Sequence, residues 1–168
     1  SLTRAELERY DIGRINPASK YASQFPQQKP VDGERIPTLA ALYAMAGPNV
    51  RFNIETKIDP AKPDETLDPV QFTRVVVDVI RAANAAERTT LQSFDWRTLL
   101  EARRIAPEIK TACLTIESNN MDTVRRTTGQ PSAWLGGLDL AAAGGSLPRL
   151  VKAAGCAVWS PFWRNVTA

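Results

Sequence analysis

The 168-residue chain contains no histidine and only two cysteines, Cys113 and Cys156. Zinc sites in proteins are built mainly from cysteine and histidine ligands, so we expect no zinc centre. For the two cysteines we expect buried free thiols, and the sequence leaves a disulfide open as the alternative. The sequence does not decide the compartment. Of the bacterial compartments, we expect the periplasm or the outside of the cell rather than the cytoplasm.

The sequence also lacks long apolar runs and clusters of basic residues. No apolar segment approaches the roughly 18 to 20 residues that a membrane-spanning helix needs, so we expect no stable membrane insertion. Lysine and arginine number 21 against 18 acidic residues, a net charge of +3, and they are scattered along the chain. We therefore expect no nucleic-acid partner. No G-x-G-x-x-G follows a predicted strand, so a dinucleotide-binding fold has no motif support.

From Pro37 onward, strand-like and helical segments alternate. Strands are expected at 50–57, 89–94, 109–116 and 156–162. Helices are expected at 37–46, 70–84, 96–105, 120–127 and 146–155, and 133–140 is ambiguous. Residues 1–36 look irregular except for a short helix at 3–10, where Thr3 and Glu6 have the spacing of a capping box. Alternating strands and helices predict an α/β fold with a parallel sheet.

The stretch "RFNIETKID", residues 51–59, favours one kind of parallel sheet. Its apolar residues alternate with ionisable ones, whereas a strand buried on both faces is usually apolar throughout. Strands of a (β/α)8 TIM barrel can be polar near the active-site mouth. A complete barrel takes about 250 residues. We therefore expect a single domain over 1–168 that forms a partial barrel, about strands four to seven.

Glu55 and Lys57 are the residues in this strand best suited to chemistry. They lie two positions apart, so their side chains emerge on the same face of the strand near its end. A carboxylate there can bind a hard cation such as Mg²⁺ or Ca²⁺, and a lysine can contact a phosphate oxygen. The alternative is a solvent-exposed face that carries a Glu–Lys ion pair.

Three segments in this order, "RIPTLAALYAMAG", "VRFNIETK" and "TTLQSFDWRTL", resemble the glycerophosphodiester phosphodiesterase family. Upstream, "LTRAELERYDIG" and "FPQQKPVDGERIPTL" are also similar to that family. The resemblance covers most of residues 2–115 and continues more faintly through "VWSPFWRNVT".

The resemblance implies a TIM-barrel hydrolase that cleaves glycerophosphodiesters to an alcohol and glycerol 3-phosphate with a divalent metal, Mg²⁺ or Ca²⁺. Glu55 matches the family's metal-binding glutamate, and Lys57 matches its phosphate-contacting lysine. Gln92, Ser93 and Phe94 match the end of the next strand at the pocket wall, and Trp159 is a candidate for the alcohol side. For Phe94 and Trp159, core packing is the alternative. The resemblance also implies that the irregular segment 1–36 lies near the barrel mouth.

The chain departs from the family pattern in several places. The family's two catalytic histidines, in H-R-G and H-D stretches, and its E-x-D metal pair have no counterpart here. A middle portion of the enzyme explains these gaps, and a histidine-free pseudoenzyme is the rival explanation. Either way, we expect these 168 residues alone to be inactive. A related lipid phosphodiesterase, sphingomyelinase D-like or phospholipase-like, and a non-catalytic phospholigand-binding barrel stay open as alternatives.

Overall fold

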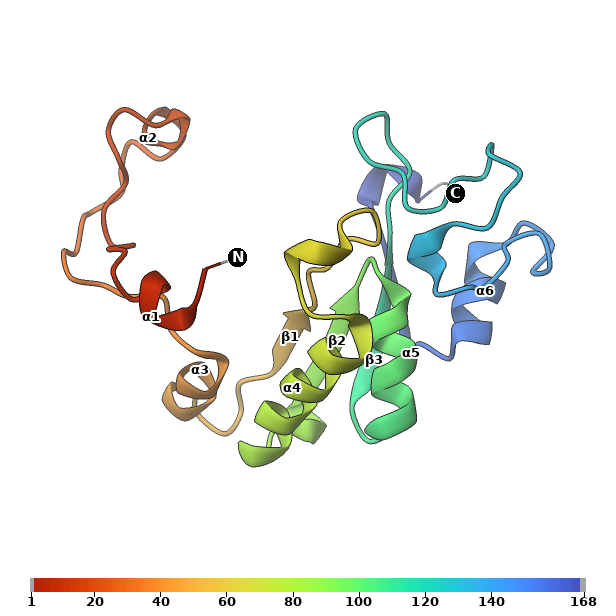
Figure 1. Ribbon diagram of the computed structural model, residues 1–168, viewed down its shortest axis with the longest axis horizontal. Helices are drawn as coiled ribbons and strands as arrows, with labels where there is room; N and C mark the ends of the chain where they lie inside the picture. Colours follow the sequence, from red (N-terminus) through yellow and green to blue (C-terminus); the bar gives the residue numbers. More distant parts are fainter. Residues whose placement is uncertain (1, 167–168) are drawn as a thin grey trace. The chain divides into compact units, whose positions relative to one another are not determined.

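The computed structural model describes residues 2–166, and the chain divides into two compact units, Ser1–Met45 and Ala46–Ala168 (Figure 1). The first unit contains three short helices: α1 (Arg4–Leu7), α2 (Lys20–Gln24) and α3 (Leu39–Met45). The sequence predicted α1 and α3 but not α2, because Lys20–Gln24 is too short to show a helical period.

Local hydrogen bonds fold the first unit. The Thr3 hydroxyl accepts from the Glu6 backbone N–H at 3.3 Å, and the Glu6 carboxylate accepts from the Thr3 backbone N–H at 2.7 Å. The predicted capping box is therefore confirmed. Further along, the Asp11 carboxylate accepts from the backbone N–H groups of Gly33 and Gly13, which lowers the pKa of Asp11. The expected position of residues 1–36 at a barrel mouth stays a prediction.

The second unit is built on a four-stranded sheet. Its strands are β1 (Phe52–Glu55), β2 (Thr89–Ser93), β3 (Lys110–Thr115) and β4 (Val158–Pro161). All neighbours pair in parallel, in the order β1-β2-β3-β4. Consecutive parallel strands lie side by side in this way in a (β/α)8 barrel. The four predicted strands and the α/β class are confirmed, and a partial barrel is consistent with this order.

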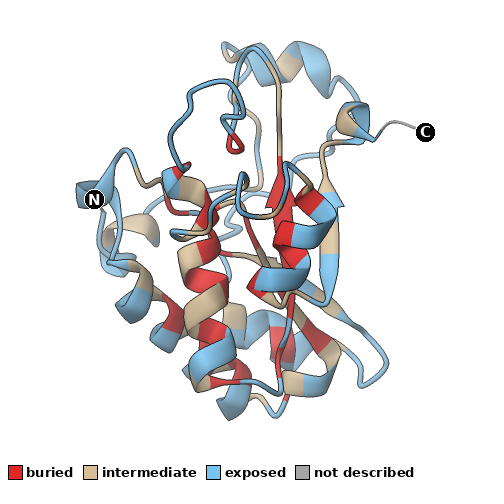
Figure 2. Cartoon of the chain, turned by 90° about the vertical axis from the view of Figure 1, so that its right-hand side faces the viewer, coloured by how far each residue is buried: buried red, intermediate tan, exposed pale blue. Residues whose placement is uncertain are grey.

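Three helices of the second unit have buried apolar side chains: α4 (Pro69–Ala82), α5 (Trp96–Ile105) and α6 (Leu147–Ala154). α5 packs against β2 and β3, and α4 packs against α5, where the buried residues gather (Figure 2). Buried apolar side chains of this core include Val77, Ile80, Leu91, Trp96 and Leu99. An Asp or Ser side chain caps the N-terminus of each of these predicted helices: Asp68 for α4, Asp95 for α5 and Ser146 for α6.

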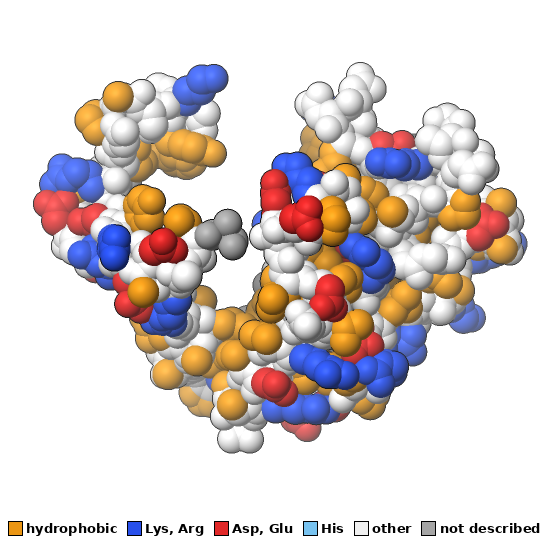
Figure 3. Space-filling view, in the orientation of Figure 1, with side chains coloured by type: hydrophobic (Ala, Val, Ile, Leu, Met, Phe, Trp, Pro, Cys, Tyr) orange, Lys and Arg blue, Asp and Glu red, His pale blue; other side chains and the backbone are white. Residues whose placement is uncertain are grey.

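The two faces of the sheet differ in burial. On β2, Leu91 and Ser93 are buried toward α5, whereas Thr90 and Gln92 on the other face are half-buried. The register aligns Glu55 with Gln92, so the ionisable row predicted on β1 continues onto β2 as a polar row. On the surface shown in Figure 3, acidic and basic side chains of the second unit are intermingled.

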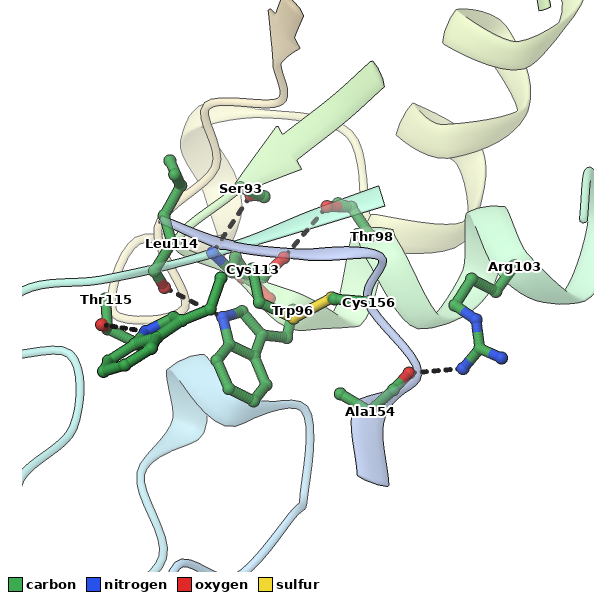
Figure 4. The surroundings of a disulfide bond; sticks show 11 residues. Ser93, Trp96, Thr98, Arg103, Cys113, Leu114, Thr115, Ala154 and Cys156 are labelled. Carbon is green, nitrogen blue, oxygen red and sulfur yellow. Dashed lines mark hydrogen bonds between the residues drawn. A yellow bond between two sulfur atoms is a disulfide. The ribbon is translucent and has the colours of Figure 1, made fainter. Parts of the chain in front are cut away.

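The prediction of two free thiols is wrong. Cys113 and Cys156 form a disulfide, with their Cα atoms 5.8 Å apart, instead of two free thiols (Figure 4). Cys113 lies in β3, and Cys156 directly follows the left-handed Gly155 that ends α6 (φ 70°). The turn at Gly155 places Cys156 against the sheet, a contact that the spacing in the sequence does not reveal.

Residues 120–127 do not form the expected helix. The Asp122 carboxylate accepts from the backbone N–H groups of Val124 and Arg125, and Arg125 has a left-handed φ of 55°. The Thr123 backbone N–H donates to the Ile116 carbonyl. Short polar side chains here satisfy the backbone outside a helix, as Asp and Thr often do. The ambiguous stretch that follows contains the 3-10 turn η3 (Ala133–Leu135).

No helix in residues 2–166 combines the length and the apolar character that crossing a membrane would require.

Candidate functional site

A pocket of about 230 Å³ lies beside the carboxyl ends of β1 and β2. We call it the Glu55 pocket. Its lining residues are Glu55, Thr56, Lys57, Ile58, Asp59, Glu65, Thr66, Phe94, Met121 and Trp134. In (β/α)8 barrels, the carboxyl ends of the strands carry the active site. The structure thus brings three sequence-predicted residues, Glu55, Lys57 and Phe94, to one pocket.

Glu55 and Lys57 form an ion pair in this pocket. Lys57 Nζ lies 2.7 Å from Glu55 Oε1, with side-chain exposures of 78% for Lys57 and 23% for Glu55. The expectation that both side chains emerge on one face is confirmed. Their roles as metal ligand and phosphate contact stay predictions, because an ion pair is also what the alternative interpretation expects.

Gln92 lies next to Glu55 on the same face of the sheet. Its side-chain oxygen accepts a hydrogen bond from Asn53 Nδ2 at 2.8 Å, and its backbone carbonyl accepts from the Thr56 N–H at 3.0 Å. Gln92 does not line the Glu55 pocket in this structure. Its hydrogen bonds instead link β1 to β2 on either side of Glu55 in the sequence. A substrate contact by Gln92 stays a prediction.

Trp159 lies apart from the other predicted residues. The register aligns it with Cys113 and Ser93, on the face opposite to Gln92. Its indole N–H donates to the Thr115 hydroxyl at 2.9 Å, and it does not line the Glu55 pocket. This position fits the packing alternative, in which the indole joins β4 to β3.

Buried hydroxyl groups hold the backbone around the pocket. The Thr56 and Thr98 hydroxyls lie 2.7 Å apart, and the Ser93 hydroxyl donates to the Thr56 carbonyl at 2.8 Å. Thr56 separates Glu55 from Lys57 in the chain, so these bonds fix the segment that carries both charges. The strand end β1 is thereby tied to β2 and to α5.

Asp95 continues this support at the start of α5. Its side chain is fully buried, caps the helix by accepting from the Arg97 N–H at 3.1 Å, and pairs with the Arg97 guanidinium at 2.6 Å. The hydrogen bond to Asp95 raises the pKa of Arg97. This ion pair anchors the turn that contains Phe94, which explains how Phe94 is held at the pocket.

Comparison with known proteins decides the family. The Glycerophosphoryl diester phosphodiesterase family matches residues 1–158 of the chain. The chain belongs to this family. A search of curated proteins found no match.

Several solved structures have a similar fold. A putative glycerophosphoryl diester phosphodiesterase from Silicibacter pomeroyi is 27% identical with a TM-score of 0.76, and the match covers 99% of this chain and 52% of the other. A glycerophosphodiester phosphodiesterase from Parabacteroides distasonis is 16% identical with a TM-score of 0.51, over 85% of this chain and 48% of the other. A putative one from Galdieria sulphuraria is 18% identical with a TM-score of 0.53, over 96% and 55%. The chain therefore spans about half the length of these structures.

Whether the residues of the Glu55 pocket suit a divalent cation depends on their ligand atoms. Within residues 2–166, no group of three or more Asp, Glu, Cys or His side chains is placed to hold a metal ion. Glu55 is an accessible hard oxygen ligand of the type that Mg²⁺ and Ca²⁺ accept, and Mg²⁺ sites often use one or two carboxylates with water. Glu55 thus fits such a cation as one ligand, and further ligands would have to complete its coordination.

Sequence reasoning missed several residues of the Glu55 pocket. Asp59 and Glu65 follow β1, Met121 lies in the turn after β3, and Trp134 lies in η3. Asp59 was readable as the next odd position of the charged stretch. No sequence pattern indicates Trp134, because η3 lies beside the pocket only once the chain is folded.

Proposed function

We propose that this family member is part of a phosphodiesterase that cleaves glycerophosphodiesters to an alcohol and glycerol 3-phosphate, with Mg²⁺ or Ca²⁺. The observation that carries the proposal is the Glu55–Lys57 pair at the carboxyl end of β1, in a pocket of a chain that matches the family over residues 1–158. The solved relatives with this name share the fold.

Each residue of the pair has a distinct proposed role. Glu55 would hold the divalent cation through its carboxylate oxygens, and the cation supplies positive charge to the phosphate when it is bound. Lys57, whose ammonium is largely exposed, would contact a non-bridging phosphate oxygen and stabilise the charge that grows there in the transition state. Thr56 holds the backbone between them through its buried hydrogen bonds, so the spacing of the two charges is set before substrate arrives.

The sequence contains no histidine, so no histidine of this chain can transfer the protons of the reaction. Activating a nucleophile and protonating the leaving alcohol both need a titratable group near the scissile bond. We therefore expect the 168 residues alone to bind the phosphodiester without turning it over.

The test is the release of glycerol 3-phosphate from glycerophosphocholine by the protein expressed from its whole reading frame. Activity with Mg²⁺ or Ca²⁺ that disappears with EDTA, and that Glu55→Ala abolishes, is the expected result. Near-normal turnover by the Glu55→Ala variant would remove Glu55 from the site. Cleavage of sphingomyelin in preference to glycerophosphocholine would favour the related lipid phosphodiesterase instead.

The lack of histidine supports a second candidate function, a phospholigand-binding barrel without catalysis. It predicts that the whole protein binds glycerol 3-phosphate, that Lys57→Met weakens this binding, and that no diester is hydrolysed with any divalent cation.

A further inference from the structure

The first unit contains a loop, residues 15–31, whose two ends are held together. The Val31 N–H donates to the Gly13 carbonyl at 3.0 Å, and the Arg14 guanidinium pairs with the Asp32 carboxylate at 2.8 Å. The helix α2 lies at the far end of this segment, which we call the α2 loop (Figure 1). Because its base is closed by these bonds, the loop has a defined shape of its own.

The α2 loop exposes two aromatic rings. The side chains of Tyr21 and Phe25 are 64% and 55% exposed, and their rings stack with centroids 6.4 Å apart. Residues four positions apart along a helical turn lie on the same face, so both rings point to one side. Phe25 also lines an open hollow of about 540 Å³, together with Ile15, Gln24, Pro26, Gln27 and Gln28. The loop therefore presents an apolar surface with neutral amides to solvent.

The α2 loop is also basic. Lys20 and Lys29 are its only charged residues, and both are exposed. Among residues 2–166, neither ammonium has an ion-pair partner. The acidic residues nearest along the chain lie outside the loop: Asp11, Asp32 and Glu34. The charge of Asp32 is already compensated by Arg14. The loop thus combines two uncompensated positive charges with an exposed apolar surface.

This combination fits the surface of an anionic membrane. A tyrosine ring is stable at the level of the lipid headgroups, a phenylalanine ring enters the boundary of the acyl chains, and lysines are attracted to anionic lipids. Glutamine amides can donate to phosphate and ester oxygens. A small soluble anion fits less well, because neither lysine lines the hollow. A second copy of the loop fits less well too, because it would bring like charges together.

We propose that the α2 loop binds the surface of membranes that contain anionic phospholipids. Tyr21 and Phe25 enter the headgroup region, and Lys20 and Lys29 contact the anionic headgroups. Such binding is peripheral and needs no membrane-spanning helix. It involves the first unit alone and does not depend on the reaction proposed for the Glu55 pocket.

Binding of the 168-residue chain to vesicles tests the proposal. Co-sedimentation is measured at low salt with vesicles of phosphatidylcholine alone and with vesicles of equal parts phosphatidylcholine and phosphatidylglycerol. We expect the mixed vesicles to bind at least ~10-fold more tightly, because two lysines contact their negative surface. Added NaCl should weaken this binding. Equal binding to both kinds of vesicle, or no binding to either, would overturn the proposal.

Two double variants separate the rings from the charges. Tyr21→Ser/Phe25→Ser should weaken binding to the mixed vesicles by at least ~10-fold. Lys20→Gln/Lys29→Gln should instead abolish the preference for phosphatidylglycerol. Urea denaturation of each variant shows whether it folds like the wild type, which we expect because all four side chains are exposed. A lysine variant that folds and keeps the full preference would contradict the proposal, whatever the ring variant does.

The matched control is Trp163→Ser in the second unit. Trp163 is 70% exposed and its ring lies under the Arg164 guanidinium, so it is also an aromatic side chain beside a positive charge. We expect this variant to bind the mixed vesicles as the wild type does. A loss as large as that of Tyr21→Ser/Phe25→Ser would place the lipid-binding surface outside the α2 loop.

Light scattering without lipid tests the rival occupant, a second copy of the chain. We expect Tyr21→Ser/Phe25→Ser to leave the molar mass in solution unchanged. A wild-type dimer that these substitutions convert to a monomer would assign the exposed rings to self-association and overturn the proposal.

Discussion

The ammonium nitrogen of Lys57 lies 2.7 Å from Oε1 of Glu55, although the lysine side chain is 78% exposed and the glutamate only 23%. The glutamate is thus the fixed member of the pair, and the lysine approaches it from the solvent side. In the proposed site, Lys57 and a cation compete for the same carboxylate.

This competition predicts that only one of two substitutions weakens cation binding. Glu55→Gln removes the anionic ligand and should weaken Mg²⁺ or Ca²⁺ binding by at least ~10-fold. Lys57→Met removes the competing ammonium and should leave cation affinity unchanged or tighter, while kcat/KM of the whole protein falls ~10- to 100-fold through loss of a charged hydrogen bond. Calorimetric titration with each cation measures the first quantity. Parallel weakening by both substitutions would contradict a metal role for Glu55.

Thr98 should contribute to stability through its hydroxyl group. Thr98 is buried, its hydroxyl lies 2.7 Å from that of Thr56, and it donates to the Asp95 carbonyl at 3.0 Å. Thr98→Val keeps the shape but leaves buried partners without hydrogen bonds. We expect the free energy of unfolding to fall by about 1–3 kcal/mol in urea denaturation. Thr98→Ser keeps the hydroxyl and should retain more stability; an equal loss would assign the effect to packing alone.

The disulfide between Cys113 and Cys156 should stabilise the second unit. The cysteines are 43 residues apart, so closing this loop removes conformational entropy from the unfolded chain worth roughly 4 kcal/mol. We expect a reducing agent to lower the urea midpoint of the wild-type chain and to leave a Cys113→Ala/Cys156→Ala variant unaffected. A wild-type midpoint that is indifferent to the reductant would show that the bond does not form in solution.

Glu101 should make stability depend on acidic pH. Its hydrogen bonds with Arg104, at 2.8 and 2.6 Å, lower the pKa of the Glu101 carboxyl below its ordinary value of 4.5. The unfolded chain therefore takes up this proton at a higher pH than the folded one. The stabilisation is present above the ordinary value and is lost as the pH falls through the lowered folded-state pKa.

The measurement is the free energy of unfolding of wild type and Glu101→Gln between pH 6 and pH 3. The wild type should be more stable at pH 6, and the difference should shrink toward pH 3. Arg104→Met should abolish most of that pH dependence, because it removes the partner. A difference that stays constant over the range would exclude the ion pair as its source.

Local patterns were sufficient to predict the sheet and the main helices. Alternation located β1, helical periodicity located α4, and proline and glycine marked the ends of α6. Glu55 and Lys57 were placed correctly on one face because two positions along a strand always return to the same side. These features depend only on neighbours in the sequence.

The errors arose where the structure depends on distant contacts. The disulfide joins β3 to a residue that only the turn at Gly155 brings near. Trp134 reaches the pocket through a 3-10 turn whose position is set by Ser132 and the buried Leu135. Residues 120–127 contain helix-compatible residues, but the carboxylate of Asp122 binds the backbone in another conformation.

The hydroxyl bonds around Thr56 also bear on how the strands find their register during folding. Among residues 2–166, every buried side-chain nitrogen or oxygen has a hydrogen-bond partner, including those of Thr56, Ser93 and Thr98. Shifting β1 by one residue against β2 would turn these hydroxyls to the wrong face and leave buried polar atoms unpaired. The same shift in purely apolar strands would cost less free energy, because it would leave no buried polar atom unpaired. The same bonds that hold the pocket in shape therefore discriminate the native alignment of β1 and β2 from its misregistered competitors.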